Sequence, residues 1–160
     1  MAFGAPSLKG RALRYLAQRE HSRAELERKL ARHVEDRDGA QAAEQITEAL
    51  DELAARGLQS EARVAESVVR AQGARFGNLR LRQTLQAKGL DADLVAAALK
   101  QAAATELERA REVWRRRFGA PGADAAERAR QMRFLAARGF AGDVIRQVVK
   151  GVPEGDDDGS

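Results

Sequence analysis

Residues 81–90 read Leu-Arg-Gln-Thr-Leu-Gln-Ala-Lys-Gly-Leu, and this stretch decides the fold class. Leu81 and Leu85 are four residues apart, so they lie on one face of a helix. Gly89 can adopt the left-handed backbone that ends a helix, and Leu90 can then pack back over the turn. The stretch therefore predicts a short helix closed by a tight glycine turn.

Two further signals recur along the chain and indicate a repeat. A pentapeptide of the form Ala-x-x-apolar-apolar occurs at residues 12–16, 65–69 and 110–114. An anchor leucine follows each of them at similar spacing: Leu30, Leu85 and Leu135. Chance can produce the pentapeptide in an alanine-rich chain, but the agreement of two independent signals favours a true repeat. We expect three degenerate units, each built as helix, helix, turn, helix.

The repeat predicts how the chain is organised. We expect a flexible lead over residues 1–7 and a disordered acidic tail over residues 151–160. Three three-helix repeats lie between them, at residues 8–58, 59–103 and 104–150.

Local signals divide these repeats into nine helices. Ser22 and Glu25 have the spacing of a capping box at the start of the second helix. A polar loop is expected from Glu35 to Gly39, and Asp91 is a suitable N-cap for a sixth helix. A separate, long seventh helix is expected to carry Trp114.

The composition supports an all-α fold. Apolar residues make up 44% of the chain but aromatic residues only 4%, so the core must consist mainly of Ala, Leu and Val. Such a core suits close helix packing better than a β-sandwich. The chain has no cysteine, no apolar stretch typical of a signal peptide and no run of 18 apolar residues. We expect a cytoplasmic protein without disulfides.

The charge is unevenly distributed. The formal net charge is +4, but the segment 153–160 carries four acidic residues and no basic one. Without those acids, 28 basic residues face 20 acidic ones, and most of the basic residues are arginines. Because arginine binds phosphate and carboxylate groups well, the charge indicates either a nucleic acid or an acidic protein groove as partner. The alternative is a solvated surface that only keeps the protein soluble.

The region from Arg70 to Leu99, with the stretch 81–90 at its centre, resembles the signature region of the RecX family. The segment Phe134-Leu-Ala-Ala-Arg-Gly-Phe140 resembles the last repeat of that family, and the resemblance extends over roughly residues 8–150. One departure lies at residues 59–65, where the family's acidic pair is reduced to Glu61.

The resemblance implies a fold and a function. RecX-like proteins consist of three tandem three-helix, helix-turn-helix-like units in an elongated, curved arrangement. They bind in the groove of the RecA recombinase filament on DNA, where they hinder ATP hydrolysis, strand exchange and repressor autocleavage. The expected partner is therefore the RecA filament. Weak binding to single-stranded or duplex DNA is possible, a monomer is expected, and no membrane is involved.

The residues give no indication of an enzyme. His21 and His33 lie in polar stretches without a second metal ligand at suitable spacing, and we expect both to be solvated surface histidines. The glycines at Gly73 and Gly77 lack the Gly-Lys-Ser/Thr ending of a phosphate-binding loop. Trp114 is expected in the core. We therefore predict no catalytic site, no metal and no cofactor.

Two basic clusters are the candidate contact surface for RecA or DNA. The first spans the helix junction around Gly73 and Gly77, and the second lies on the predicted seventh helix. The candidate contact residues are Arg70, Arg75, Arg80, Arg82, Lys88, Arg111, Arg115 and Arg116. The alternative for the seventh helix is a solvated face, partly neutralised by Glu106, Glu108 and Glu112.

Two other functions stay open. Helix-turn-helix units with arginine-rich faces also occur in transcription regulators, so a protein that binds DNA directly is the main rival. It predicts DNA affinity that falls steeply with salt in the absence of RecA. A helical-repeat scaffold for an unrelated protein is the third option.

Overall fold

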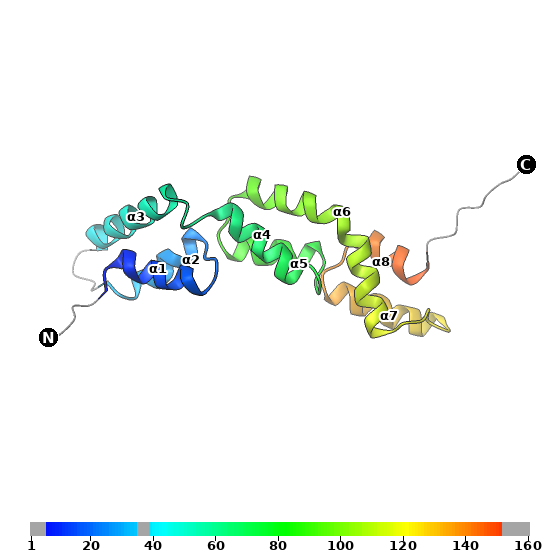
Figure 1. Cartoon of the computed structure of the whole chain (residues 1–160). Helices are drawn as coiled ribbons and strands as arrows, with labels where there is room; N and C mark the ends of the chain where they lie inside the picture. Colours follow the sequence, from blue (N-terminus) through cyan, green and yellow to red (C-terminus); the bar gives the residue numbers. More distant parts are fainter. Residues whose placement is uncertain (1–5, 35–38, 152–160) are drawn as a thin grey trace, which may run out of the picture. The chain divides into compact units, whose positions relative to one another are not determined.

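The computed structural model describes residues 6–34 and 39–151. Over these residues every regular secondary-structure element is an α-helix, so the all-α prediction is confirmed (Figure 1). The helices are α1 (Leu8–Gln18), α2 (Arg23–Ala31), α3 (Gly39–Ala55), α4 (Glu61–Gln72), α5 (Asn78–Ala87), α6 (Ala92–Arg117), α7 (Ala125–Ala137) and α8 (Gly142–Val149).

The chain divides into two compact units. Among the described residues, unit 1 comprises residues 6–34, 39–67 and 85–94, and unit 2 comprises residues 68–84 and 95–151. The chain passes between the units within α4, α5 and α6, since each of these helices contributes residues to both.

Unit 1 has a core formed by α1, α2 and α3. Its buried side chains are Ala12, Leu26, Leu30, Ile46, Leu50 and Leu53. Ala12 and the anchor Leu30 are completely buried. The small alanine side chain lets the helices approach closely, as the repeat predicts, because a methyl group fills little of the space between two backbones.

The predicted capping box starts α2. The Ser22 hydroxyl accepts a hydrogen bond from the Glu25 backbone N–H, and the Glu25 carboxylate accepts one from the Ser22 N–H. The same hydroxyl donates to the carbonyl oxygen of Lys88 at 2.6 Å. The cap therefore also ties α2 to the turn between α5 and α6, which the sequence spacing alone does not indicate.

Unit 2 has a core formed by the second half of α6 together with α7 and α8. Ala110, Val113, Leu135, Phe140, Ile145, Val148 and Val149 are buried in it. Trp114 packs against this core and donates its indole N–H to Gln131 Oε1 at 3.0 Å. The prediction that Trp114 belongs to the core is confirmed.

The predicted helix-ending glycine Gly89 is also confirmed, since its φ is positive at 73°. Gly57 and Gly139 have positive φ as well, at 70° and 85°. A side chain is strained in this backbone region, so glycine is the residue that can end these helices with a sharp turn.

The sequence predicts nine helices, whereas the structure has eight in the part of the chain that it describes. The predicted sixth and seventh helices form one helix of 26 residues, α6, because no glycine or proline lies between Asp91 and Gly119. Asp91 still has its predicted role, since its carboxylate accepts from the Asp93 N–H at 3.2 Å. The predicted unit boundary at residues 103 and 104 falls within α6.

Three sequence predictions concern residues at or beyond the edge of the described chain. Residues 1–5 of the predicted lead and 152–160 of the predicted acidic tail lie outside the described residues, as do residues 35–38 of the predicted polar loop. Within that loop, Gly39 is the first residue of α3, so the prediction that it belongs to a loop is wrong.

Candidate functional site

Unit 2 carries a hollow of about 220 Å³ that is lined by basic and apolar side chains. We call it the arginine–phenylalanine hollow, and its lining residues are Ala74, Arg75, Val113, Arg116, Arg117, Phe134 and Arg138. Its residues come from the turn after α4, from the end of α6 and from the end of α7. It contains four guanidinium groups and no carboxylate.

A backbone contact brings these distant segments together. The Gly77 N–H donates to the Arg138 carbonyl oxygen at 2.9 Å, and the Leu79 N–H donates to the Gly139 carbonyl oxygen at 3.0 Å. The contact is so close that a Cβ atom on Gly77 would lie 2.4 Å from backbone atoms of Gly139 and Phe140. The turn before α5 and the turn after α7 therefore meet backbone to backbone.

Phenylalanine rings hold the guanidinium groups in place. The guanidinium carbons of Arg80, Arg75 and Arg138 lie 4.7, 5.3 and 6.0 Å from the centre of the Phe76 ring. Arg138 also lies 4.8 Å from the Phe134 ring. An arginine that stacks on a ring is attracted by the ring face and keeps its N–H edge available for an anion. This arrangement suits the binding of a carboxylate or a phosphate.

Arg109 supports the same surface from inside. Its guanidinium group donates to the carbonyl oxygens of Gly73, Phe76 and Ala102 and to Asn78 Oδ1, at 2.7–3.0 Å. Burial lowers the pKa of this group below its ordinary value. Arg109 therefore fastens the turn after α4 to α6.

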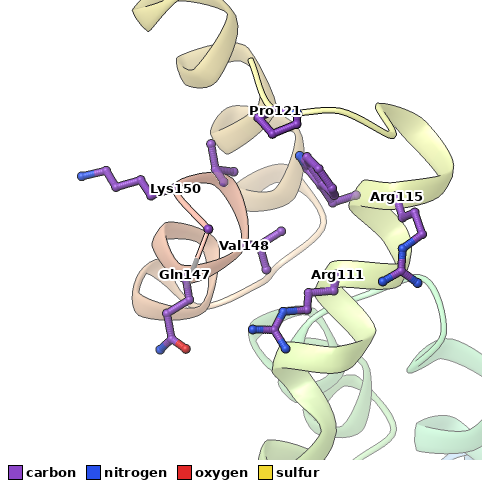
Figure 2. A pocket seen from close by; sticks show the side chains of 9 residues that line it. Arg111, Arg115, Pro121, Gln147, Val148 and Lys150 are labelled. Carbon is purple, nitrogen blue, oxygen red and sulfur yellow. The ribbon is translucent and has the colours of Figure 1, made fainter. Parts of the chain in front are cut away.

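The structure separates the predicted contact residues. Arg75 and Arg116 line the arginine–phenylalanine hollow, and Arg80 stacks beside it on Phe76. Arg70 and Arg82 are exposed, and among the described residues neither forms an ion pair. Arg111 and Arg115 line a second hollow, between α6 and α8 (Figure 2).

Lys88 belongs to a different environment. It lies in unit 1, where its ammonium group donates to the Glu25 carboxylate at 2.9 Å. Arg19 donates to the other oxygen of the same carboxylate at 2.7 Å. Burial alone would raise the pKa of Glu25, but the hydrogen bonds from Arg19 and Lys88 lower it to about 2. Lys88 therefore has an internal ion pair within unit 1.

Two expectations about charged residues are wrong. His21 is not a solvated histidine, because its side chain is completely buried. Its Nδ1 lies 3.0 Å from the Arg19 carbonyl oxygen and its Nε2 lies 2.7 Å from Lys29 Nζ. Glu106 does not neutralise the arginines on its helix, since it is buried and accepts a hydrogen bond from the Ala141 N–H.

Glu112 has the neutralising role that was expected of it. Its two oxygens pair with Arg115 at 2.9 Å and with Arg116 at 3.0 Å. One carboxylate thus serves two guanidinium groups, so the surface keeps a positive excess.

Three residues in the hollow or beside it were not among the predicted contacts: Phe76, Phe134 and Arg138. A signal for them is present in the sequence. Arg-Phe pairs occur at residues 75–76, 117–118 and 133–134, and basic residues next to aromatic ones are typical of surfaces that bind anions.

Over the described residues, no group of His, Cys, Asp and Glu could hold a metal ion. In the same part of the chain, no helix has the length and apolar character that crossing a membrane requires.

Comparisons with known proteins place the chain among related sequences. Residues 60–99 match the family model described as the second three-helix domain of RecX, and residues 104–149 match its third three-helix domain. Regulatory protein RecX of Leptothrix cholodnii is 58% identical over 90% of this chain and 88% of its own length. Regulatory protein RecX of Ralstonia nicotianae is 47% identical over 96% of this chain and 92% of its own length.

A solved structure has the same fold. The crystal structure of RecX from Lactobacillus salivarius superimposes with a TM-score of 0.72, at 22% identity, over 89% of this chain and 92% of that one. The repeated three-helix arrangement predicted from the sequence agrees with this likeness.

Proposed function

The chain belongs to the RecX family of regulatory proteins, and we propose that it binds the RecA recombinase filament and restrains its activities. The activities concerned are ATP hydrolysis, strand exchange and repressor autocleavage, as the resemblance to the family implies. The protein acts by binding in the filament groove and catalyses no reaction of its own. Through RecA it influences DNA repair and the SOS response in the cytoplasm.

The observation that carries this proposal is the arginine–phenylalanine hollow. Four guanidinium groups line the hollow together with apolar side chains. Four arginines, Arg75, Arg80, Arg117 and Arg138, lie over the rings of Phe76 and Phe134. A pre-positioned guanidinium group binds an anion more strongly because less side-chain entropy is lost. A groove with acidic side chains or a DNA backbone within reach would supply those anions.

ATP hydrolysis by RecA on single-stranded DNA tests the proposal. The wild-type protein should slow hydrolysis at amounts stoichiometric with RecA. The variant Arg75→Gln/Arg138→Gln removes two guanidinium groups from the hollow. It should require at least about tenfold more protein for the same effect, since even one hydrogen bond to a charged group contributes about 1.5–3 kcal/mol.

A matched control separates this effect from a general loss of charge. Arg14→Gln/Arg32→Gln removes the same charge from exposed positions of unit 1, and the half-effective concentration should change less than twofold. Unchanged hydrolysis with the wild-type protein would refute the proposed function. Equal losses in both variants would refute the role of the hollow.

Direct binding to DNA is the second candidate function. The specific observation in its favour is the stacking of arginines on Phe76 and Phe134, since aromatic rings among cations also bind single strands. Affinity for single-stranded DNA without RecA, measured by fluorescence anisotropy from 50 to 300 mM salt, decides between the two. Tight and sequence-selective binding in that range would favour DNA as the main partner.

A further inference from the structure

The second hollow of unit 2 lies between α6 and α8 and has a volume of about 250 Å³. Arg111, Trp114 and Arg115 line it from α6, and Val148, Lys150 and Gly151 line it from the end of α8. Figure 2 shows the two arginines projecting from one helix, with Val148 and Lys150 on the opposite side. We call it the α6–α8 hollow.

The α6–α8 hollow carries more positive charge than the described residues neutralise. Arg115 shares the single Glu112 carboxylate with Arg116. Within the described part of the chain, neither Arg111 nor Lys150 has an ion-pair partner. Two arginines four residues apart on a helix repel each other, so an anion between α6 and α8 would be stabilising.

The chain itself supplies an anion next to this position. Gly151 lines the hollow, and the residues that follow contain Glu154 and Asp156–Asp158. At 3.3–3.6 Å per residue, Glu154 lies within roughly 10 Å of Gly151 along the chain and Asp156 within roughly 17 Å. Because Gly151, Arg111 and Arg115 line the same hollow, the carboxylates that follow Gly151 are tethered close to both arginines.

We propose that the acidic segment Glu154–Asp158 binds the α6–α8 hollow of its own chain through Arg111 and Arg115. Single exposed ion pairs are weak. A tether of a few residues, however, gives the segment an effective concentration in the millimolar range, which favours such a contact over the same contact between molecules. The segment then competes with other anions for these two arginines and leaves the arginine–phenylalanine hollow available.

The single tryptophan of the chain reports on this contact, because Trp114 lines the hollow. Acrylamide is a neutral quencher, so its access to the indole depends on coverage and not on charge. In the full-length protein, the variant Glu154→Gln/Asp156→Asn/Asp157→Asn/Asp158→Asn should show a quenching constant about twofold higher than the wild type. Salt at 1 M should raise the constant of the wild type and leave that of the variant unchanged, since the screening length falls to about 3 Å.

Two further variants make the test specific. Arg111→Gln/Arg115→Gln keeps the acidic segment and should reproduce the increase in quenching. The control Glu44→Gln/Glu48→Gln/Glu66→Gln/Glu108→Gln changes the net charge equally at exposed positions outside the hollow and should quench as the wild type does.

The results can overturn the proposal in two ways. Equal quenching of Trp114 in the wild type and in the variant with the neutral segment would exclude the contact. A quenching constant that depends on protein concentration between 1 and 100 μM would mean that the acidic segment binds a second copy of the chain.

Discussion

Replacing Gly77 with alanine should separate the two turns that build the arginine–phenylalanine hollow. The added Cβ atom would lie 2.4 Å from the Gly139 carbonyl oxygen and from the Phe140 N and Cα atoms. All three are backbone atoms, so no side-chain rotation can relieve the overlap. The turns must move apart, and Phe140, which is 2% exposed, moves with them.

The expected loss of stability follows from these contacts. Overpacking at a tight site costs about 1–3 kcal/mol. The displacement also weakens two hydrogen bonds, from Gly77 to Arg138 and from Leu79 to Gly139, each of which contributes about 1 kcal/mol. We expect the free energy of unfolding of unit 2 to fall by about 3 kcal/mol.

Urea unfolding followed by the fluorescence of Trp114 measures this change, because the indole packs against the core of unit 2. Gly142→Ala is the matched control. Gly142 is the first residue of α8, and its Cβ atom would meet only the end of the Arg146 side chain at 3.5 Å. The control should change the stability by less than about 1 kcal/mol, in the stabilising direction. A loss below about 1 kcal/mol for Gly77→Ala would refute the argument from close approach.

Three further predictions concern the buried polar groups. Hydrogen bonds lower the pKa of Glu25 to about 2. The contribution of this carboxylate to stability is therefore complete above the unfolded pKa of 4.5 and is lost as the pH falls towards 2. The difference in unfolding free energy between the wild type and Glu25→Gln should shrink over that range. Burial lowers the pKa of His21, so stability should decline as the pH falls below 6.5, and a proton-detected titration of this imidazole should give a midpoint below that value. Arg109→Met leaves the carbonyl groups of Gly73 and Phe76 without their donor and should destabilise unit 2 by about 3 kcal/mol in urea unfolding, whereas Arg111→Met should have little effect.

Local chemistry explains what the sequence by itself determined. The apolar stripes, the Ser22–Glu25 capping box and the positive-φ glycines at Gly57, Gly89 and Gly139 act within one or two helical turns. Such signals are visible in a few consecutive residues, so the helices and their ends could be predicted. The helix end expected between the predicted sixth and seventh helices is absent, because no glycine or proline lies there.

The same locality limits what could be predicted about the site. The roles of the basic residues depend on partners far away in the chain. Lys88 pairs with Glu25 across 63 residues, and Arg109 reaches the carbonyl oxygens of Gly73 and Phe76 across more than 30. Sequence spacing identifies a basic residue and gives no indication of whether a buried acceptor lies beside it.

The glycine turns at Gly89 and Gly139 show both what the sequence determines and what it leaves open. A Lys-Gly-Leu or Arg-Gly-Phe ending is sufficient to predict a helix stop, because only glycine is free of strain at positive φ. That the turn at Gly139 also accepts the backbone of Gly77, and thereby gathers Arg75 and Arg138 around one hollow, was decided by the tertiary structure. The reason is that close packing of two backbones depends on the three-dimensional space between them, which no periodic pattern in the sequence indicates.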